Sequence, residues 1–175
     1  MPVWILGSST FGAQLAAMLG LPYAFASHFA PAQMEEAIAI YRERFRPSEQ
    51  LAKPYVMLGV NITAAPTDEE ARFLFSSAQQ STLNLRRGRP GRLAPPVEGF
   101  YESLSPSERA VVDHTFAVAI VGGPEKVRRG VADFVGRTGA DELMVSANIY
   151  DHGLRKRSFT ILAEAQGLGR LDAAA

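Results

Sequence analysis

Short apolar runs and helical stripes alternate along the chain. Residues 3–6 form an uninterrupted apolar run, Val-Trp-Ile-Leu, which is typical of a strand buried on both faces. After a short polar stretch, Phe11, Leu15 and Met18 recur at helical spacing, and Gly20 is a favourable helix end. The first twenty residues therefore predict one strand–loop–helix unit.

The same order of elements recurs further along the chain. Apolar runs predict three more strands, over residues 21–26, 55–63 and 142–147. Helices are predicted from Pro31, after the capping boxes of Thr67 with Glu70 and Ser105 with Glu108, and over residues 123–138 and 154–166. Because each strand is followed by helical sequence, the pattern predicts an α/β fold with parallel strands.

Two segments depart from this pattern. Residues 85–99 combine four arginines with three prolines and predict a long loop. Its arginines suit either a bound anion or a plain solvated loop. Residues 169–175 end in three alanines and predict a frayed tail.

Composition narrows the class of protein. Of the 175 residues, 47% are hydrophobic and 21% charged, which is typical of a globular domain. Eighteen basic residues balance eighteen acidic ones, so a nucleic-acid partner is not expected. The absence of cysteine excludes disulfides, thiolate metal sites and cysteine nucleophiles, and three scattered histidines make no metal site. No apolar stretch approaches the ~20 residues of a membrane span and no signal peptide is evident, so we expect a cytoplasmic protein.

The most informative polar stretch is Gly7, Ser8, Ser9 and Thr10, between the first strand and the first helix. Backbone N–H groups at a helix start, together with serine hydroxyls, suit a phosphate monoester such as the end of flavin mononucleotide (FMN). The alternative is a plain serine N-cap with no ligand. The stretch is neither a Walker loop nor a three-glycine dinucleotide motif.

Three further residues are candidates for lining a substrate pocket. His28 follows the second predicted strand, where parallel α/β folds bind ligands, although an ordinary loop histidine is an equal alternative. Asn61 interrupts an apolar strand and suits either a pocket or a satisfied core amide. His152 follows Asp151, but adjacent side chains rarely orient each other for catalysis.

The chain resembles the bacterial luciferase-like, flavin-dependent monooxygenases, also called LLM-class flavin-dependent oxidoreductases. The resemblance spans residues 3–165 and is specific only when its segments are taken together. They are WILGSS at 4–9, GLPYAFA at 20–26, PYVMLGVN at 54–61, LNLRRGRPG at 83–91, GPEKV at 123–127 and TGADELM at 138–144. It implies reduced FMN as cofactor, or a deazaflavin, with electrons from a separate flavin reductase. It also places Ser8 and Ser9 at the flavin phosphate.

The resemblance further implies that this chain is half of a TIM (β/α)8 barrel. Residues 1–168 match strands 5–8, four βα units, and the family's main catalytic histidine belongs to the other half, so we assign no catalytic residue here. Four units cannot close a barrel. We therefore expect oxygenation only together with a missing N-terminal half. The alternatives are a homo-oligomeric half-barrel that binds flavin or another phosphate ligand without catalysis, or a remnant without ligand.

Overall fold

The computed structural model describes residues 1–168, which divide into two compact units. The first unit comprises Met1–Val60, His114–Val118 and Phe134–Ser146, and the second comprises the remaining described residues. The tail predicted over residues 169–175 lies outside the described residues. Because strand β3 (Val56–Ala64) contributes to both units, its two parts are described with the unit to which each belongs.

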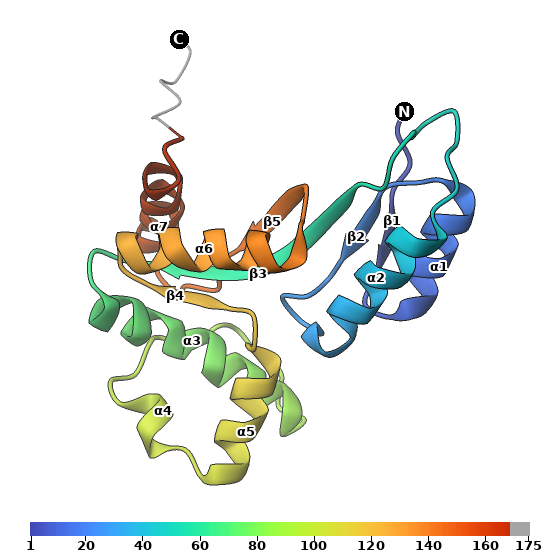
Figure 1. The fold of residues 1–175 in the computed structure, drawn as a ribbon. Helices are drawn as coiled ribbons and strands as arrows, with labels where there is room; N and C mark the ends of the chain where they lie inside the picture. The colour runs from blue at the N-terminus through green and yellow to red at the C-terminus, as the bar shows by residue number, and fades with distance from the viewer. Residues whose placement is uncertain (169–175) are drawn as a thin grey trace. The chain divides into compact units, whose positions relative to one another are not determined.

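The first unit contains two strand–helix repeats beside β3. They run from β1 (Ile5–Gly7) to α1 (Thr10–Leu19), then from β2 (Tyr23–Phe25) through a 3₁₀ helix (Pro31–Gln33) to α2 (Met34–Arg44). Strand β1 pairs in parallel with β2, and β2 with β3, while β5 (Glu142–Ser146) also pairs with β3. Helices α1 and α2 lie side by side next to these strands (Figure 1). The predicted parallel sheet is confirmed.

Aromatic residues form the core of the first unit. The rings of Tyr23 and Tyr41 are both fully buried, with centroids 5.4 Å apart. The Tyr41 hydroxyl donates to the Leu21 carbonyl (2.9 Å) and accepts from the Tyr55 N–H (3.1 Å). This hydroxyl therefore links α2 to the residues just before β2 and just before β3, and it satisfies two backbone groups.

The second unit is built on the last part of β3. It contains α3 (Asp68–Arg86), α4 (Phe100–Ser103), most of α5 (Pro106–Thr115), β4 (Ile120–Gly122), the first part of α6 (Pro124–Thr138) and α7 (His152–Ala165). Strand β4 pairs in parallel with β3, with Ile62 opposite Ile120. Leu74 and Ile149 belong to its hydrophobic core, and the Ser158 hydroxyl accepts from the Ala64 N–H at 2.9 Å.

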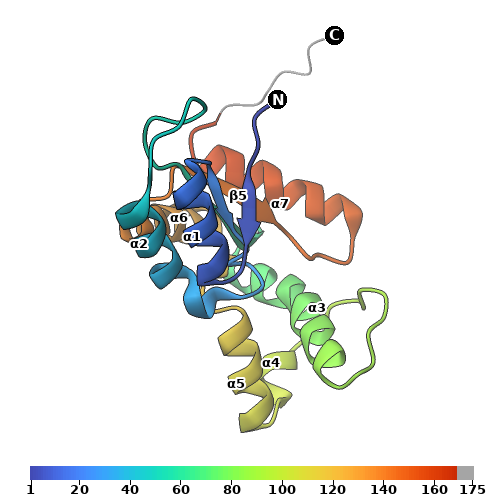
Figure 2. The same ribbon diagram turned by 90° about the vertical axis from the view of Figure 1, so that its right-hand side faces the viewer.

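Several sequence predictions need correction. Strand β4 and helix α4 were not predicted, because the apolar run at residues 116–121 directly follows a helical segment and the four residues of α4 are too short to show a periodicity. The apolar run at residues 3–6 is not buried on both faces, since Leu6 is 72% exposed and Val3, before β1, is 52% exposed. Gly7 lies against Gly12 of α1, so Leu6 points to the opposite face of the strand, which no described element covers. Figure 2 shows β1 in dark blue alongside α1.

Candidate functional site

The loop between β1 and α1 offers unused hydrogen-bond donors to solvent. Ser9 is the N-cap residue of α1, yet its side chain makes no hydrogen bond to the helix end. Ser8 and Ser9 are both exposed, and no acidic residue lies in the first turn of α1. Since the first N–H groups of a helix have no partner within it, they point out at this end together with the two hydroxyls. The arrangement favours a bound anion.

Glycines and a buried tyrosine hold this loop against the sheet. A Cβ at Gly12 would lie 3.3 Å from the Gly7 Cα, so the two glycines allow α1 to start close to β1. The Tyr23 hydroxyl donates to the Ser9 carbonyl at 3.1 Å. Burial raises the pKa of Tyr23 to about 12, so the phenol keeps the proton that it donates. The loop is therefore positioned by β2 as well as by its own strand.

His28 lies on the loop that follows β2. The neighbouring Ser27 hydroxyl donates to the Gly59 carbonyl at 2.6 Å, and the His28 ring packs over Gly59 on β3. Burial lowers the pKa of His28, so its imidazole is neutral at neutral pH. Because β1 and β2 are parallel, with Gly7 opposite Phe25, the Ser8–Ser9 loop and His28 both follow the carboxyl ends of their strands, at the same end of the sheet. The first unit thus brings the predicted phosphate loop and His28 to one side.

Asn61 belongs to the second unit and lies within β3 rather than after it. Its side chain is 6% exposed. A buried amide inside a strand agrees with the core alternative stated above. A role for Asn61 in lining a substrate pocket stays a prediction.

His152 is the first residue of α7 and is exposed. Its Nδ1 lies 2.8 Å from Nη2 of Arg155, whereas the Asp151 carboxylate accepts from the Leu154 N–H at 2.8 Å. Asp151 therefore caps the helix instead of orienting the imidazole. The structure supports no catalytic pair at these two residues, and a substrate contact by His152 stays a prediction.

With this geometry in place, comparison with known proteins identifies the family. The profile of the family described as luciferase-like monooxygenase matches residues 1–142. The chain belongs to the luciferase-like monooxygenase family. A protein of Escherichia coli strain K12 named luciferase-like monooxygenase is 46% identical over 166 residues, which are 95% of this chain and 50% of that protein. The protein YvbT of Bacillus subtilis strain 168 is 49% identical over 164 residues, covering 94% and 49%.

A solved structure agrees with these relatives. The crystal structure of apo-MsnO8 superimposes with a TM-score of 0.85 at 33% identity, covering 95% of this chain and 51% of that one. The chain thus matches part of a luciferase-like TIM-barrel structure and spans about half the length of the curated relatives it matches. The structure of the coenzyme F420-dependent tetrahydromethanopterin reductase of Methanopyrus kandleri shares the fold, with a TM-score of 0.56 at 11% identity. None of the helices within residues 1–168 is long and apolar enough to cross a membrane.

Sequence reasoning missed the residues that support the site. The sequence shows Tyr23 and Gly59 only as parts of strands, yet Tyr23 anchors the Ser8–Ser9 loop and Gly59 accommodates His28. Gly59 did carry a signal, because a glycine inside an apolar strand often marks a close approach. Nothing in the sequence connected Tyr23 to Ser9, since the two are joined only by the pairing of β1 with β2.

Proposed function

We propose that this chain is the C-terminal half of an FMN-dependent luciferase-like monooxygenase and that it oxygenates a substrate only when joined by an N-terminal half. The observation that carries this proposal is the match of nearly the whole chain to about half of each relative. The missing half would supply the barrel strands that this chain lacks. Four or five strands cannot enclose a barrel interior by themselves.

The free edge of β1 is where we expect the other half to pair. The Ile5 N–H donates to Pro22 and the Gly7 carbonyl accepts from Ala26, so the backbone groups of Leu6 between them point away from β2. An exposed apolar side chain belongs to this edge strand, since Leu6 is 72% exposed. An unpaired strand edge that carries an exposed apolar side chain favours a further strand as the partner.

The residues of the Ser8–Ser9 loop fit the phosphate of FMN. In the proposed complex the two hydroxyls and the first N–H groups of α1 donate to the phosphate oxygens, and the helix dipole adds to the attraction. Reduced FMN, provided by a separate flavin reductase, supplies the electrons for reaction with oxygen, and a deazaflavin is the alternative cofactor. His28, neutral and held over Gly59, would face ligand from the same edge of the sheet.

The phosphate assignment is tested by comparing FMN with riboflavin, which lacks the phosphate. Fluorescence titration of the chain should show tighter binding of FMN, and Ser8→Ala/Ser9→Ala should weaken FMN by about tenfold while leaving riboflavin unchanged. Ser81→Ala, an exposed serine on α3, is the matched control. Equal losses for both flavins would refute the phosphate site. Absence of FMN binding even with the N-terminal half of a close relative added would refute the proposed function.

The second candidate is a half-barrel that dimerises and binds flavin or another phosphate ligand without catalysis. The same exposed edge at Leu6 favours it, because a second copy can pair there. Light scattering separates the two. A dimer that binds FMN but shows no substrate oxidation after addition of the other half supports the second candidate, whereas a monomer of 19.0 kDa excludes it.

A further inference from the structure

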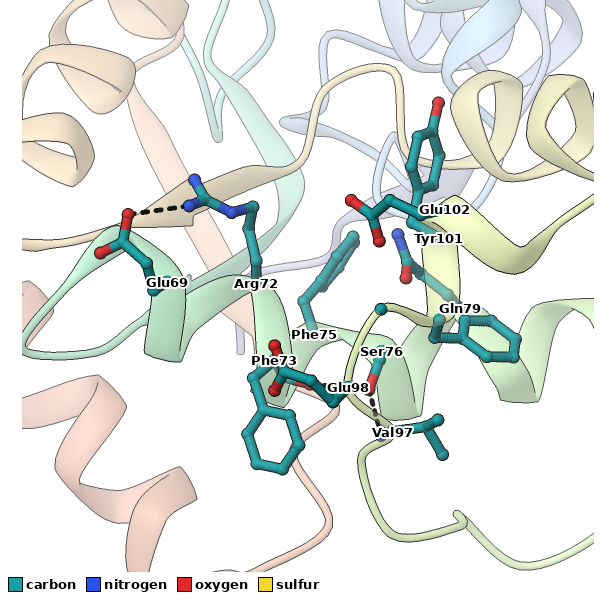
Figure 3. A pocket seen from close by; sticks show the side chains of 12 residues that line it. Glu69, Arg72, Phe73, Phe75, Ser76, Gln79, Val97, Glu98, Tyr101 and Glu102 are labelled. Carbon is teal, nitrogen blue, oxygen red and sulfur yellow. Dashed lines mark hydrogen bonds and ion pairs between the residues drawn. The ribbon is translucent and has the colours of Figure 1, made fainter.

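A cavity of about 280 Å³ lies in the second unit, whereas the loop after β1 belongs to the first. One wall is the first half of α3, and the other is formed by residues 97–102, which include most of α4 (Figure 3). Phe75 lines the cavity and its side chain is only 8% exposed. The cavity thus has an apolar surface between α3 and the segment of residues 95–102, called the returning segment below.

Hydrogen bonds fasten this returning segment to α3. The Ser76 hydroxyl donates to the Phe73 carbonyl at 2.6 Å and accepts from the Val97 N–H at 2.8 Å. One turn further along, Nε2 of Gln80 donates to the Pro95 carbonyl at 2.9 Å. The wall is therefore held in place before any ligand enters, which lowers the entropic cost of binding.

Helix α5 fixes the same segment from its other end. Nε of Arg109 donates to the Tyr101 carbonyl at 3.2 Å, and its Nη2 donates to the Glu102 carbonyl. The guanidinium also lies 5.6 Å from the centre of the Tyr101 ring, and the Tyr101 hydroxyl donates to Asp113 at 2.9 Å. Arg109 is thus engaged with backbone and ring and forms no ion pair with the Glu102 carboxylate.

One buried polar side chain points into the cavity without a partner. Gln79 is 8% exposed, and its amide makes no hydrogen bond to any of the described residues. Figure 3 shows this amide directed into the space between Phe75 and Glu102. The amide is therefore open to a polar group of a ligand that enters the cavity.

The charges around the cavity are predominantly negative. Three carboxylates and one guanidinium line it, and the Arg72 guanidinium is already paired with Glu69 at 2.9 Å. Glu98 and Glu102 have no ion-pair partner among residues 1–168. Both carboxylates therefore remain available to a cation that enters beside the ring of Phe75.

We propose that this cavity binds a small organic cation, an ammonium group on an apolar body. The ammonium would lie near Glu98 and Glu102, its N–H would donate to the Gln79 carbonyl oxygen, and the apolar body would pack on Phe75. Carboxylates attract the charge, and an aromatic ring stabilises both a cation and its apolar substituent. This site is independent of the flavin phosphate loop and is tested without flavin.

Three phenyl probes of similar shape test the proposal by calorimetric or ligand-observed NMR titration of the whole chain. Benzylammonium should bind about tenfold more tightly than benzyl alcohol, and phenylacetate should bind weakest. The double variant Glu98→Gln/Glu102→Gln should abolish the preference for benzylammonium over benzyl alcohol. Gln79→Leu should weaken benzylammonium by several-fold, on the order of one lost hydrogen bond.

The matched control is Glu43→Gln/Glu49→Gln, two exposed carboxylates in the first unit, which should leave binding of all three probes unchanged. Since Glu98 and Glu102 are also exposed, both double variants are expected to fold, which circular dichroism verifies. Equal affinity for benzylammonium and benzyl alcohol, tighter binding of phenylacetate, unchanged benzylammonium binding in the Glu98/Glu102 variant, or no binding of any probe would each overturn the proposal.

Discussion

The imidazole of His28 occupies the space that a side chain at position 59 would fill. A Cβ placed on Gly59 would lie 2.2 Å from Nδ1 of His28, well inside van der Waals contact. The glycine on β3 therefore sets the position of the histidine on the loop after β2. This contact connects two segments that the sequence separates by about thirty residues, and it lies wholly in the first unit.

Gly59→Ala is expected to displace the His28 ring and to lower the free energy of unfolding by about 1–3 kcal/mol. Gly136→Ala on α6 is the matched control, because nothing lies within 4 Å of a Cβ there. A helix interior favours alanine, so this control should leave stability unchanged or raise it by less than about 1 kcal/mol. Urea denaturation of the two variants measures both effects.

The cause is tested by a double-mutant cycle. If the His28 ring is what alanine meets, His28→Ala/Gly59→Ala should lose less stability than the sum of the two single variants. Additive losses would show that strain elsewhere on β3 accounts for the Gly59→Ala effect.

Burial of His28 makes the protein less stable in mild acid. Because burial lowers the pKa of His28 below the usual value of 6.5, the unfolded chain binds the proton more readily than the folded one. The free energy of unfolding should therefore fall as the pH drops below about 6.5 and continue to fall until the folded pKa is passed. Urea denaturation between pH 7.5 and pH 5 measures this dependence. His28→Gln should reduce the slope of the free energy of unfolding against pH, whereas His114→Gln should retain it. An unchanged slope in His28→Gln would contradict the assignment.

The carboxylate of Asp151 stabilises α7. Asp151→Ala removes the acceptor for the Leu154 N–H and should lower the free energy of unfolding by about 1 kcal/mol. Asp133→Ala, an exposed aspartate on α6, is the control and should change it little. His152→Ala should also have little effect, since the imidazole caps no helix. A larger loss for His152→Ala than for Asp151→Ala would contradict the capping role.

Glu108 is expected to contribute to acid sensitivity. Hydrogen bonds from the Ser105 hydroxyl and backbone N–H, and then from Arg87, lower the pKa of Glu108 to about 2. A lowered carboxyl pKa stabilises the fold above the unfolded value of about 4.5, and that contribution is lost as the pH falls towards 2. Glu108→Gln should therefore flatten the dependence of thermal stability on pH in this window. Glu102→Gln, four residues before α5 begins, should leave the dependence as in the wild type.

Much of the fold was predictable because its helices and longer strands carry clear periodicity. The capping box of Ser105 with Glu108 is realised, with the Ser105 N–H donating to Glu108 at 2.9 Å and the Glu108 N–H donating to the Ser105 hydroxyl at 3.4 Å. The Thr67 hydroxyl likewise accepts from the Glu70 N–H. Strand β4 was not predicted, because its apolar run directly follows a helical segment and its pairing with β3 distinguishes it from that segment.

The candidate site was predictable in part. Ser8 and Ser9 were found because a polar stretch between a strand and a helix marks a helix start, whatever the rest of the chain does. The supporting role of Tyr23 was not, because it requires the strand register that brings β2 beside β1. The cation cavity around Gln79 was hidden for the same reason, since residues 97–102 meet α3 only through tertiary hydrogen bonds.

By itself, the sequence determined the order of strands and helices apart from α4 and β4, the parallel fold class and the family, because these follow from local periodicity and short motifs. Tertiary structure alone decided which side chains are buried. The apolar run at residues 3–6 predicted a buried strand, yet Leu6 is 72% exposed, because it points away from α1 to a face of β1 that no described element covers. Hydrophobicity gives a residue its tendency to be buried, and a neighbouring element has to supply the contact.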